Sequence, residues 1–184
     1  MSTPDIVGQM IDALNASSAP YMVTCSLSSN VHGIARSTKD ADFVIEASNQ
    51  QMDSIVQAVA PVFELDPEMS FETIPMTHKT VLKNRDSDFS IELFDLSNDA
   101  HDQLWFSRRR HARVLDKDSW LPTPEDVIIQ KLRWSKSGRR RKDVDGVTNV
   151  ISVHREHLDW PYLESWCRRH GTLDLLNNLR AKAV

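Results

Sequence analysis

The sequence has few cysteines and no long apolar run, and each of these absences excludes a class of protein. Cys25 and Cys167 are the two cysteines among 184 residues, which are too few for a disulfide framework and do not form a zinc motif. No apolar stretch approaches the roughly 20 residues that cross a membrane as a helix. The first residues lack the basic start and apolar core of a secretory signal. We therefore expect a cytoplasmic protein with no membrane partner.

A basic excess is absent as well. The formal net charge is −4, with 22 Lys and Arg against 26 Asp and Glu, so no overall positive field attracts nucleic acid. The basic residues nevertheless gather in two runs, at residues 108–113 and 133–142. Such runs are usually solvated surface, and an anionic ligand is the alternative interpretation.

Apolar spacing along the chain predicts an α+β fold. Ile6 to Leu14 has helical spacing, and short apolar runs typical of strands follow it. The predicted strands lie at residues 21–24, 41–46, 71–74, 79–82, 90–94 and 112–115. Strands that precede a mainly helical second half are typical of the α+β class.

The second half of the chain contains the clearest helix start. In Thr123-Pro124-Glu125-Asp126 the threonine can cap, proline suits the first helical position, and the acids complement the positive helix end. Another helix is predicted from His101 to Arg110. We expect a core at residues 1–120 and a helical part at 121–184 that packs on it, together one structural unit.

Three carboxylates are the candidate catalytic and metal-binding residues. Asp40 and Asp42 are two apart at the start of a predicted strand, so they point to the same side, while Phe43 and Ile45 face the other. Two adjacent carboxylates repel unless a cation lies between them. Glu92 has a similar place between apolar neighbours on a later strand. Hard oxygen ligands of this kind suit Mg²⁺, although solvated surface acids are the commoner explanation of such a pair.

Several segments in the same order resemble the minimal nucleotidyltransferases. Residues 21–29 and 32–42, which end in Arg36-Ser37-Thr38-Lys39-Asp40-Ala41-Asp42, are similar to the family's strand, Gly-Ser turn, short helix and Asp-x-Asp strand. Residues 90–94 are similar to the strand with the third carboxylate, and residues 124–132 to the Glu-Asp-Leu-Ile-x-x-Lys-Leu helix. Lys142-Asp143-x-Asp145 matches a further motif in part. The resemblance covers about residues 20 to 155 and implies a mixed sheet flanked by helices.

The resemblance also implies a reaction. Asp40, Asp42 and Glu92 would form a Mg²⁺ site at which a nucleoside monophosphate passes from a nucleoside triphosphate to a hydroxyl acceptor. The nucleotide-binding residues would be Ser26 and Cys25 at the helix start, with Arg36 and Lys131 as phosphate contacts. The acceptor is left open among RNA, protein and small molecules. Stand-alone members resemble toxins of toxin–antitoxin pairs, so an antitoxin partner is a further expectation.

The sequence departs from the family pattern at two positions. Cys25 replaces the glycine before the serine, and Glu92 replaces an aspartate. A catalytically degenerate module that binds a nucleotide or a partner is therefore the alternative function. Other interpretations also stay open: Arg36 pairing with Glu46 or Asp42, and Lys131 extending along the edge of the core. If the acceptor is RNA, the basic residues 139–142 would neutralise its phosphates.

Overall fold

The computed structural model describes residues 3–68, 70–71, 77–138 and 141–183. Six strands form one mixed sheet in the order β1-β2-β6-β5-β3, and β4 pairs with β5. The strands are β1 (Tyr21–Val23), β2 (Asp40–Ile45), β3 (Phe63–Leu65), β4 (Ser70–Phe71), β5 (His78–Asn84) and β6 (Ser90–Asp95). The pair β2 and β6 is parallel, whereas β1 on β2 and β5 on β6 are antiparallel. Residues 72–74 of the predicted strand 71–74 lie outside the described residues.

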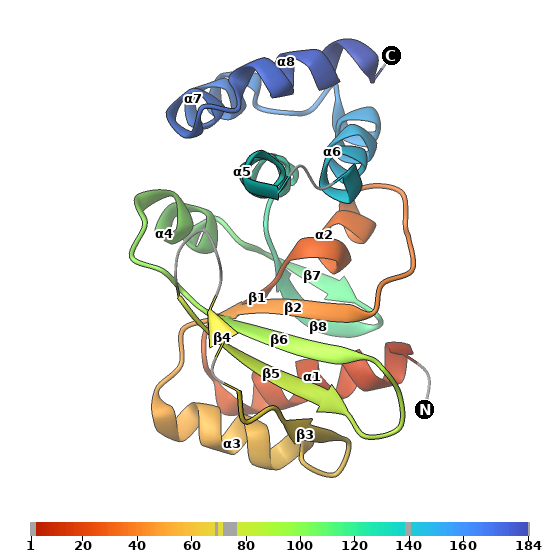
Figure 1. Ribbon diagram of the computed structural model, residues 1–184, viewed down its shortest axis with the longest axis vertical. Coiled ribbons are helices and arrows are strands. Elements are labelled where there is room, and N and C mark those ends of the chain that lie inside the picture. The colour runs from red at the N-terminus through yellow and green to blue at the C-terminus, as the bar shows by residue number, and fades with distance from the viewer. Residues whose placement is uncertain (1–2, 69, 72–76, 139–140, 184) are drawn as a thin grey trace.

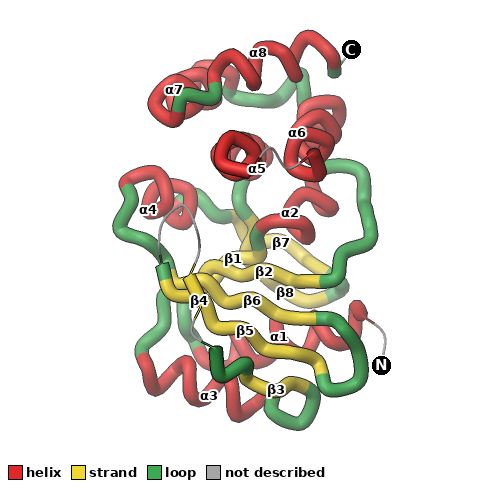
Figure 2. The backbone as a smooth tube through the Cα atoms, viewed as in Figure 1, coloured by secondary structure: helices red, strands yellow, loops and turns green. Residues whose placement is uncertain are grey.

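Helices cover both faces of the sheet (Figures 1 and 2). On one face lie α1 (Thr3–Ser17) and α3 (Asn49–Val59), and on the other lie α2 (Cys25–His32) and α4 (Ala100–Ser107). Beyond α2 and α4 stand α5 (Pro124–Gly138) and α6 (Arg141–His154), then α7 (Trp160–His170) and α8 (Leu173–Lys182). This arrangement confirms the predicted α+β fold.

Side-chain alternation divides the two central strands into a core face and a site face. Phe43 and Ile45 of β2, with Ile91 and Leu93 of β6, are buried in the hydrophobic core beneath α1 and α3. The intervening residues face the opposite side of the sheet because successive strand residues alternate. The strands therefore present carboxylates toward α2, α5 and α6, and this face carries the candidate site.

The C-terminal helices have a hydrophobic core of their own. Ile128, Leu132, Val147, Ile151 and Leu163 are fully buried there. The boundary predicted near residue 120 stays a prediction. No helix in the described part of the chain is both long enough and apolar enough to span a membrane.

The sequence did not predict one hairpin. Strands β7 (Arg110–Val114) and β8 (Lys117–Leu121) pair antiparallel through Leu115 and Asp116, whose φ angles are 49° and 61°. Two consecutive positive φ values give the turn that matches strand twist, but Leu-Asp is not the usual sequence for it. The same hairpin explains why α4 ends at Ser107 rather than at the predicted Arg110, which begins β7.

Candidate active site

Two of the three predicted carboxylates lie opposite each other on adjacent strands. Asp42 of β2 and Glu92 of β6 are partners in the parallel ladder, and Asp40 is partnered with Ser90. All three acids line one cavity of about 80 Å³. Alternation along β2 and β6 places them there, because Asp42 and Glu92 each lie between two residues of the hydrophobic core and Asp40 precedes Asp42 by two residues.

Asp42 is the buried centre of this cavity. It is 6% exposed, and burial raises its pKa to about 7, helped by the negative charges of Asp40 and Glu92. A hydrogen bond from the Cys25 thiol and the charge of Lys142 act in the opposite direction. A carboxyl group in this setting accepts either a proton or a cation, so the donor set fits a divalent ion.

Asp40 and Glu92 already have partners. Thr38 donates a hydrogen bond of 2.6 Å from its hydroxyl to Asp40 Oδ1, and Lys79 Nζ lies 3.0 Å from Glu92 Oε1. Within the described ranges, the three carboxylates do not form a set whose oxygens all lie within 4.8 Å of one another.

The turn before α2 brings backbone to the edge of the cavity. Thr24 donates its amide to the carbonyl of Asp42 at 2.9 Å, and Cys25 follows with a φ of 52°. A residue with a Cβ rarely occupies this left-handed region, which glycine occupies freely. The hydroxyls of Ser28 and Ser29 donate to the Cys25 carbonyl at 3.1 and 2.6 Å. Cys25 and Ser26 both line the carboxylate cavity.

A second cavity, of about 100 Å³, continues from the first on the side of α6. The two cavities share Ser26, Lys131 and Lys142, and the second also contains Arg36. Its cations and the start of α2 make it suitable for an anion. Arg139 and Arg140 of the basic segment 139–142 lie outside the described residues.

The structure answers the interpretations of two of these cations that involve no phosphate. Arg36 Nη1 lies 3.4 Å from Asp145 Oδ2, so the pairing with Glu46 or Asp42 that the sequence left open was wrong. Lys131 is 5% exposed and its Nζ lies 3.4 Å from Asp143 Oδ1. It is therefore a buried ion-pair partner and does not extend along the edge of the core.

Sequence reasoning missed several lining residues. Lys142 lines both cavities, and Asp143, Phe94 and Trp134 line the carboxylate cavity. The partial motif match at Lys142-Asp143-x-Asp145 could have indicated Lys142 and Asp143. Trp134 follows Lys131 by three residues and thus shares its helix face, a relation that the sequence also contained.

A separate cluster of possible metal ligands has a cation of its own. Asp99, His101 and Asp102 place one ligand atom each within 4.8 Å of the others. The guanidinium of Arg133 lies among them, 2.7 Å from Asp102 Oδ1 and 3.2 Å from His101 Nδ1. Because arginine is always charged, we assign this cluster to the contact between α4 and α5 and not to a metal.

Known proteins resemble this chain in structure but not detectably in sequence. Neither protein-family models nor curated proteins match the sequence. The crystal structure of ANT(2")-Ia in complex with adenylyl-2"-tobramycin has a TM-score of 0.66 and 8% identity, covering 92% of this chain and 97% of that chain. The lincomycin-bound lincosamide antibiotic adenylyltransferase LnuA has a TM-score of 0.56 and 12% identity, covering 82% and 98%.

A third similar structure is an antigenic nucleotidyltransferase-like protein from Paracoccidioides brasiliensis. Its TM-score is 0.55 and its identity 15%, and the match covers 97% of this chain and 92% of that chain. Identities this low establish the fold alone. Together with the sheet order and the parallel strand pair β2 and β6, these matches show that the chain has the nucleotidyltransferase fold.

Proposed function

We propose that the protein transfers a nucleoside monophosphate from a nucleoside triphosphate to a hydroxyl acceptor, in a Mg²⁺-dependent reaction. One observation carries the proposal: the cavity lined by Asp40, Asp42 and Glu92 and a cavity with three cations share Ser26, Lys131 and Lys142. A triphosphate that lies across them would have its charge opposed by the cations at one end. Its reacting phosphorus would then lie near the carboxylates.

The proposed roles follow from these positions. Asp40 and Asp42 would hold Mg²⁺, which when bound would neutralise phosphate charge and polarise the α-phosphoryl group. Lys131, Lys142 and Ser26 would bind the β- and γ-phosphates. Glu92 would take the proton of the acceptor hydroxyl. The acceptor oxygen then bonds to the α-phosphorus, the bond to the β-phosphate oxygen breaks, and pyrophosphate leaves.

The ion pair between Lys79 and Glu92 supports a second candidate function. Glu92 is engaged at 3.0 Å, and Cys25 stands where the resembling family has glycine. A protein with these features can bind a nucleotide without transferring it. The two candidates share nucleotide binding and differ in pyrophosphate release. The antitoxin partner and the cytoplasmic location stay predictions, since no described feature tests either.

Calorimetric titration with ATP, CTP, GTP and UTP tests nucleotide binding, with and without Mg²⁺. We expect one nucleotide to bind only with the metal, and binding to be lost in the Asp40→Asn/Asp42→Asn variant. The control is Asp53→Asn, which alters an exposed residue of α3 on the opposite face of the sheet. Absence of binding at millimolar nucleotide would contradict both candidates.

A label-transfer assay separates the two candidates. The protein is incubated with α-labelled nucleotide and, separately, with total RNA, total protein and a small-molecule extract. Mg²⁺-dependent labelling of one fraction, with release of pyrophosphate, supports transfer. Tight nucleotide binding without labelling of any fraction would favour the binding module.

A further inference from the structure

A third cavity adjoins the carboxylate cavity and, among the described residues, shares no lining residue with the cavity that contains Arg36. It shares Cys25, Phe94 and Trp134 with the carboxylate cavity and has a volume of about 40 Å³. Val44 and Phe94 line it, and they follow Asp42 and Glu92 by two residues on the same strand faces. Two residues along a strand span roughly 7 Å, so this cavity begins one side chain beyond the carboxylates.

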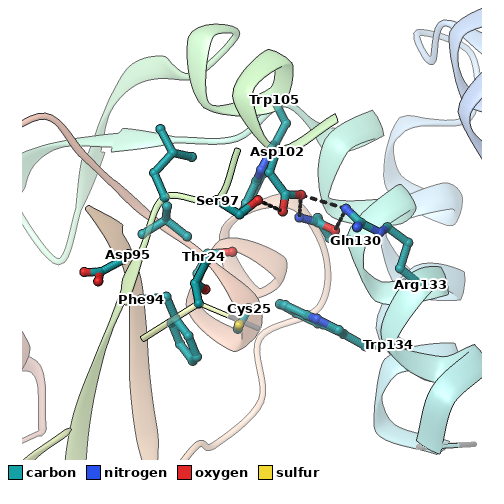
Figure 3. A pocket seen from close by; sticks show the side chains of 13 residues that line it. Thr24, Cys25, Phe94, Asp95, Ser97, Asp102, Trp105, Gln130, Arg133 and Trp134 are labelled. Atoms are coloured by element: carbon teal, nitrogen blue, oxygen red, sulfur yellow. Dashed lines mark hydrogen bonds and ion pairs between the residues drawn. The ribbon is translucent and has the colours of Figure 1, made fainter. Parts of the chain in front are cut away.

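In one wall of the cavity the two charged side chains, Asp102 and Arg133, are paired with each other (Figure 3). Asp102 Oδ2 accepts from the Ser97 hydroxyl at 2.6 Å, and Oδ1 accepts from Gln130 at 3.1 Å and Arg133 at 2.7 Å. Arg133 also donates to Gln130 Oε1 at 3.1 Å. Asp102 and Arg133 thus cancel each other, and the wall has no net charge. The carboxylate of Asp95 points away from this network (Figure 3) and is half exposed.

Two residues that line the cavity each have a polar side-chain atom without a hydrogen-bond partner among the described residues. Within the part of the chain that the structure describes, Trp105 Nε1 and Thr77 Oγ1 are buried and have no hydrogen-bond partner. Both residues line the cavity, and Trp105 is 3% exposed. An indole N–H can only donate, and a hydroxyl can donate or accept. A buried donor without a partner costs free energy unless a ligand or water supplies an acceptor oxygen.

We propose that this cavity receives a small uncharged oxygen-bearing group of the acceptor, such as a hydroxymethyl or an amide, with Trp105 and Thr77 as the residues that select it. The proposal rests on the proposed function, because it places the acceptor opposite the triphosphate across the carboxylates. It defines the acceptor by a neutral oxygen-bearing group close to its reacting hydroxyl, and not by molecular class.

Size and charge support this choice of ligand. The cavity has room for about two or three water-sized groups, which excludes a nucleobase or a phosphodiester. Phe94, Trp105 and Trp134 supply apolar surface, which suits the carbon atoms next to the oxygen. An ionic group would lose its hydration without gaining a counter-charge, because Asp102 and Arg133 already neutralise each other.

The test uses three fragments of nearly equal size: acetamide, acetate and acetamidinium. The reporter is the indole N–H signal of Trp105 in an ¹H–¹⁵N spectrum, identified by its loss in Trp105→Phe. We expect acetamide to shift this signal saturably, and acetate and acetamidinium to shift it at least tenfold more weakly. Trp105→Phe keeps an aromatic ring and removes the indole N–H donor. In this variant the affinity for acetamide, measured from the indole N–H signal of Trp134, should fall about fivefold. Thr77→Val should weaken it similarly.

Trp160→Phe is the matched control, because the indole of Trp160 donates to the Arg155 carbonyl on another face of the molecule. It should leave acetamide affinity unchanged. Failure of acetamide to shift the Trp105 signal would mean that the cavity holds water only, and acetate binding as strongly as acetamide would overturn the neutral ligand. Mg²⁺-ATP is titrated into the same samples. If ATP binds and acetamide does not, this inference fails alone; if acetamide binds and ATP does not, the proposed function fails.

Discussion

The thiol of Cys25 donates a hydrogen bond to the carboxylate of Asp42, and the backbone of Cys25 has a left-handed φ of 52°. These two features have opposite effects on the protein. The hydrogen bond favours the charged form of a buried carboxylate. The backbone angle costs about 1 to 2 kcal/mol in a residue with a Cβ.

Replacing Cys25 with glycine and with alanine separates the two effects. Cys25→Ala loses the thiol and keeps the strained angle, whereas Cys25→Gly loses the thiol and relieves the strain. We expect Cys25→Gly to be more stable than Cys25→Ala by about 1 kcal/mol in urea unfolding. Equal free energies of unfolding for the two variants would show that the angle stores no strain.

Asp42→Asn should stabilise the metal-free protein above neutral pH. The pKa of Asp42 rises from 3.8 to about 7 through burial and its acidic neighbours, so the folded state binds a proton that the unfolded state has released. Stability is therefore lost as pH rises from about 4 to 7. The uncharged amide of asparagine avoids this loss of folding stability, which is at most about 4 kcal/mol.

Urea unfolding at pH 4 and pH 8 in a chelator measures the effect, with Asp53→Asn as the exposed control. We expect Asp42→Asn to gain stability over the wild type at pH 8 and little at pH 4. Added Mg²⁺ should then stabilise the wild type more than the variant, because the ion replaces the proton. A wild type whose stability is flat from pH 4 to 8 would contradict the raised pKa.

Gly146→Ala should weaken triphosphate binding without destabilising the fold. A Cβ at this position would lie 2.9 Å from Lys131 Cε, so the lysine must move from its place between the two cavities. Alanine otherwise favours a helix by up to about 1 kcal/mol. We expect unchanged or raised thermal stability and about fivefold weaker Mg²⁺-ATP binding. Gly8→Ala in α1, which makes an ordinary 3.4 Å contact with Lys117, should leave the affinity unchanged.

Acidification should destabilise the contact of α7 with α4 and α5 through His170. Its ring stacks on Trp166 and lies 5.0 Å from that of His101. Burial, Arg133 and His101 lower the pKa of His170 from 6.5 to about 4. The unfolded state therefore binds the extra proton, and stability falls as pH drops from about 6.5 to 4.

His170→Phe should remove part of this acid dependence, on the order of 1 to 2 kcal/mol because the ring is partly exposed. The measurement is the free energy of unfolding at pH 4.5 and 7. The exposed His157 provides the control, since His157→Phe should keep the wild-type dependence. A His170→Phe variant that loses as much stability on acidification as the wild type would show that another group is responsible.

Local patterns predicted the fold well because alternation and helix spacing are properties of the sequence itself. The placement of Asp40, Asp42 and Glu92 on one sheet face followed from period-two alternation, and the register of β2 on β6 then aligned Asp42 with Glu92. The β7–β8 hairpin could not be read in the same way. Its turn depends on positive φ at Leu115 and Asp116, which tertiary packing imposes against local preference.

The parts of the site that depend on contacts between residues far apart in the chain could not be predicted from the sequence. The pairing of Lys79 with Glu92 depends on the order of β5 and β6, and the position of Lys142 depends on how α6 packs beside α5. The cavity at Trp105 has walls from α2, β2, β6, α4 and α5. No spacing rule joins residues from so many elements, so only the assembled chain reveals it.

The candidate site is built from two parts of the chain. The sheet supplies Asp40, Asp42 and Glu92, and helices α5 and α6 supply Lys131, Lys142 and Asp143. The hydrophobic core under the sheet and the core within the C-terminal helices are separate clusters. A bound triphosphate would touch both parts at once and so act as a cross-link between them. Substrate occupancy would then make the melting of the two cores a single event.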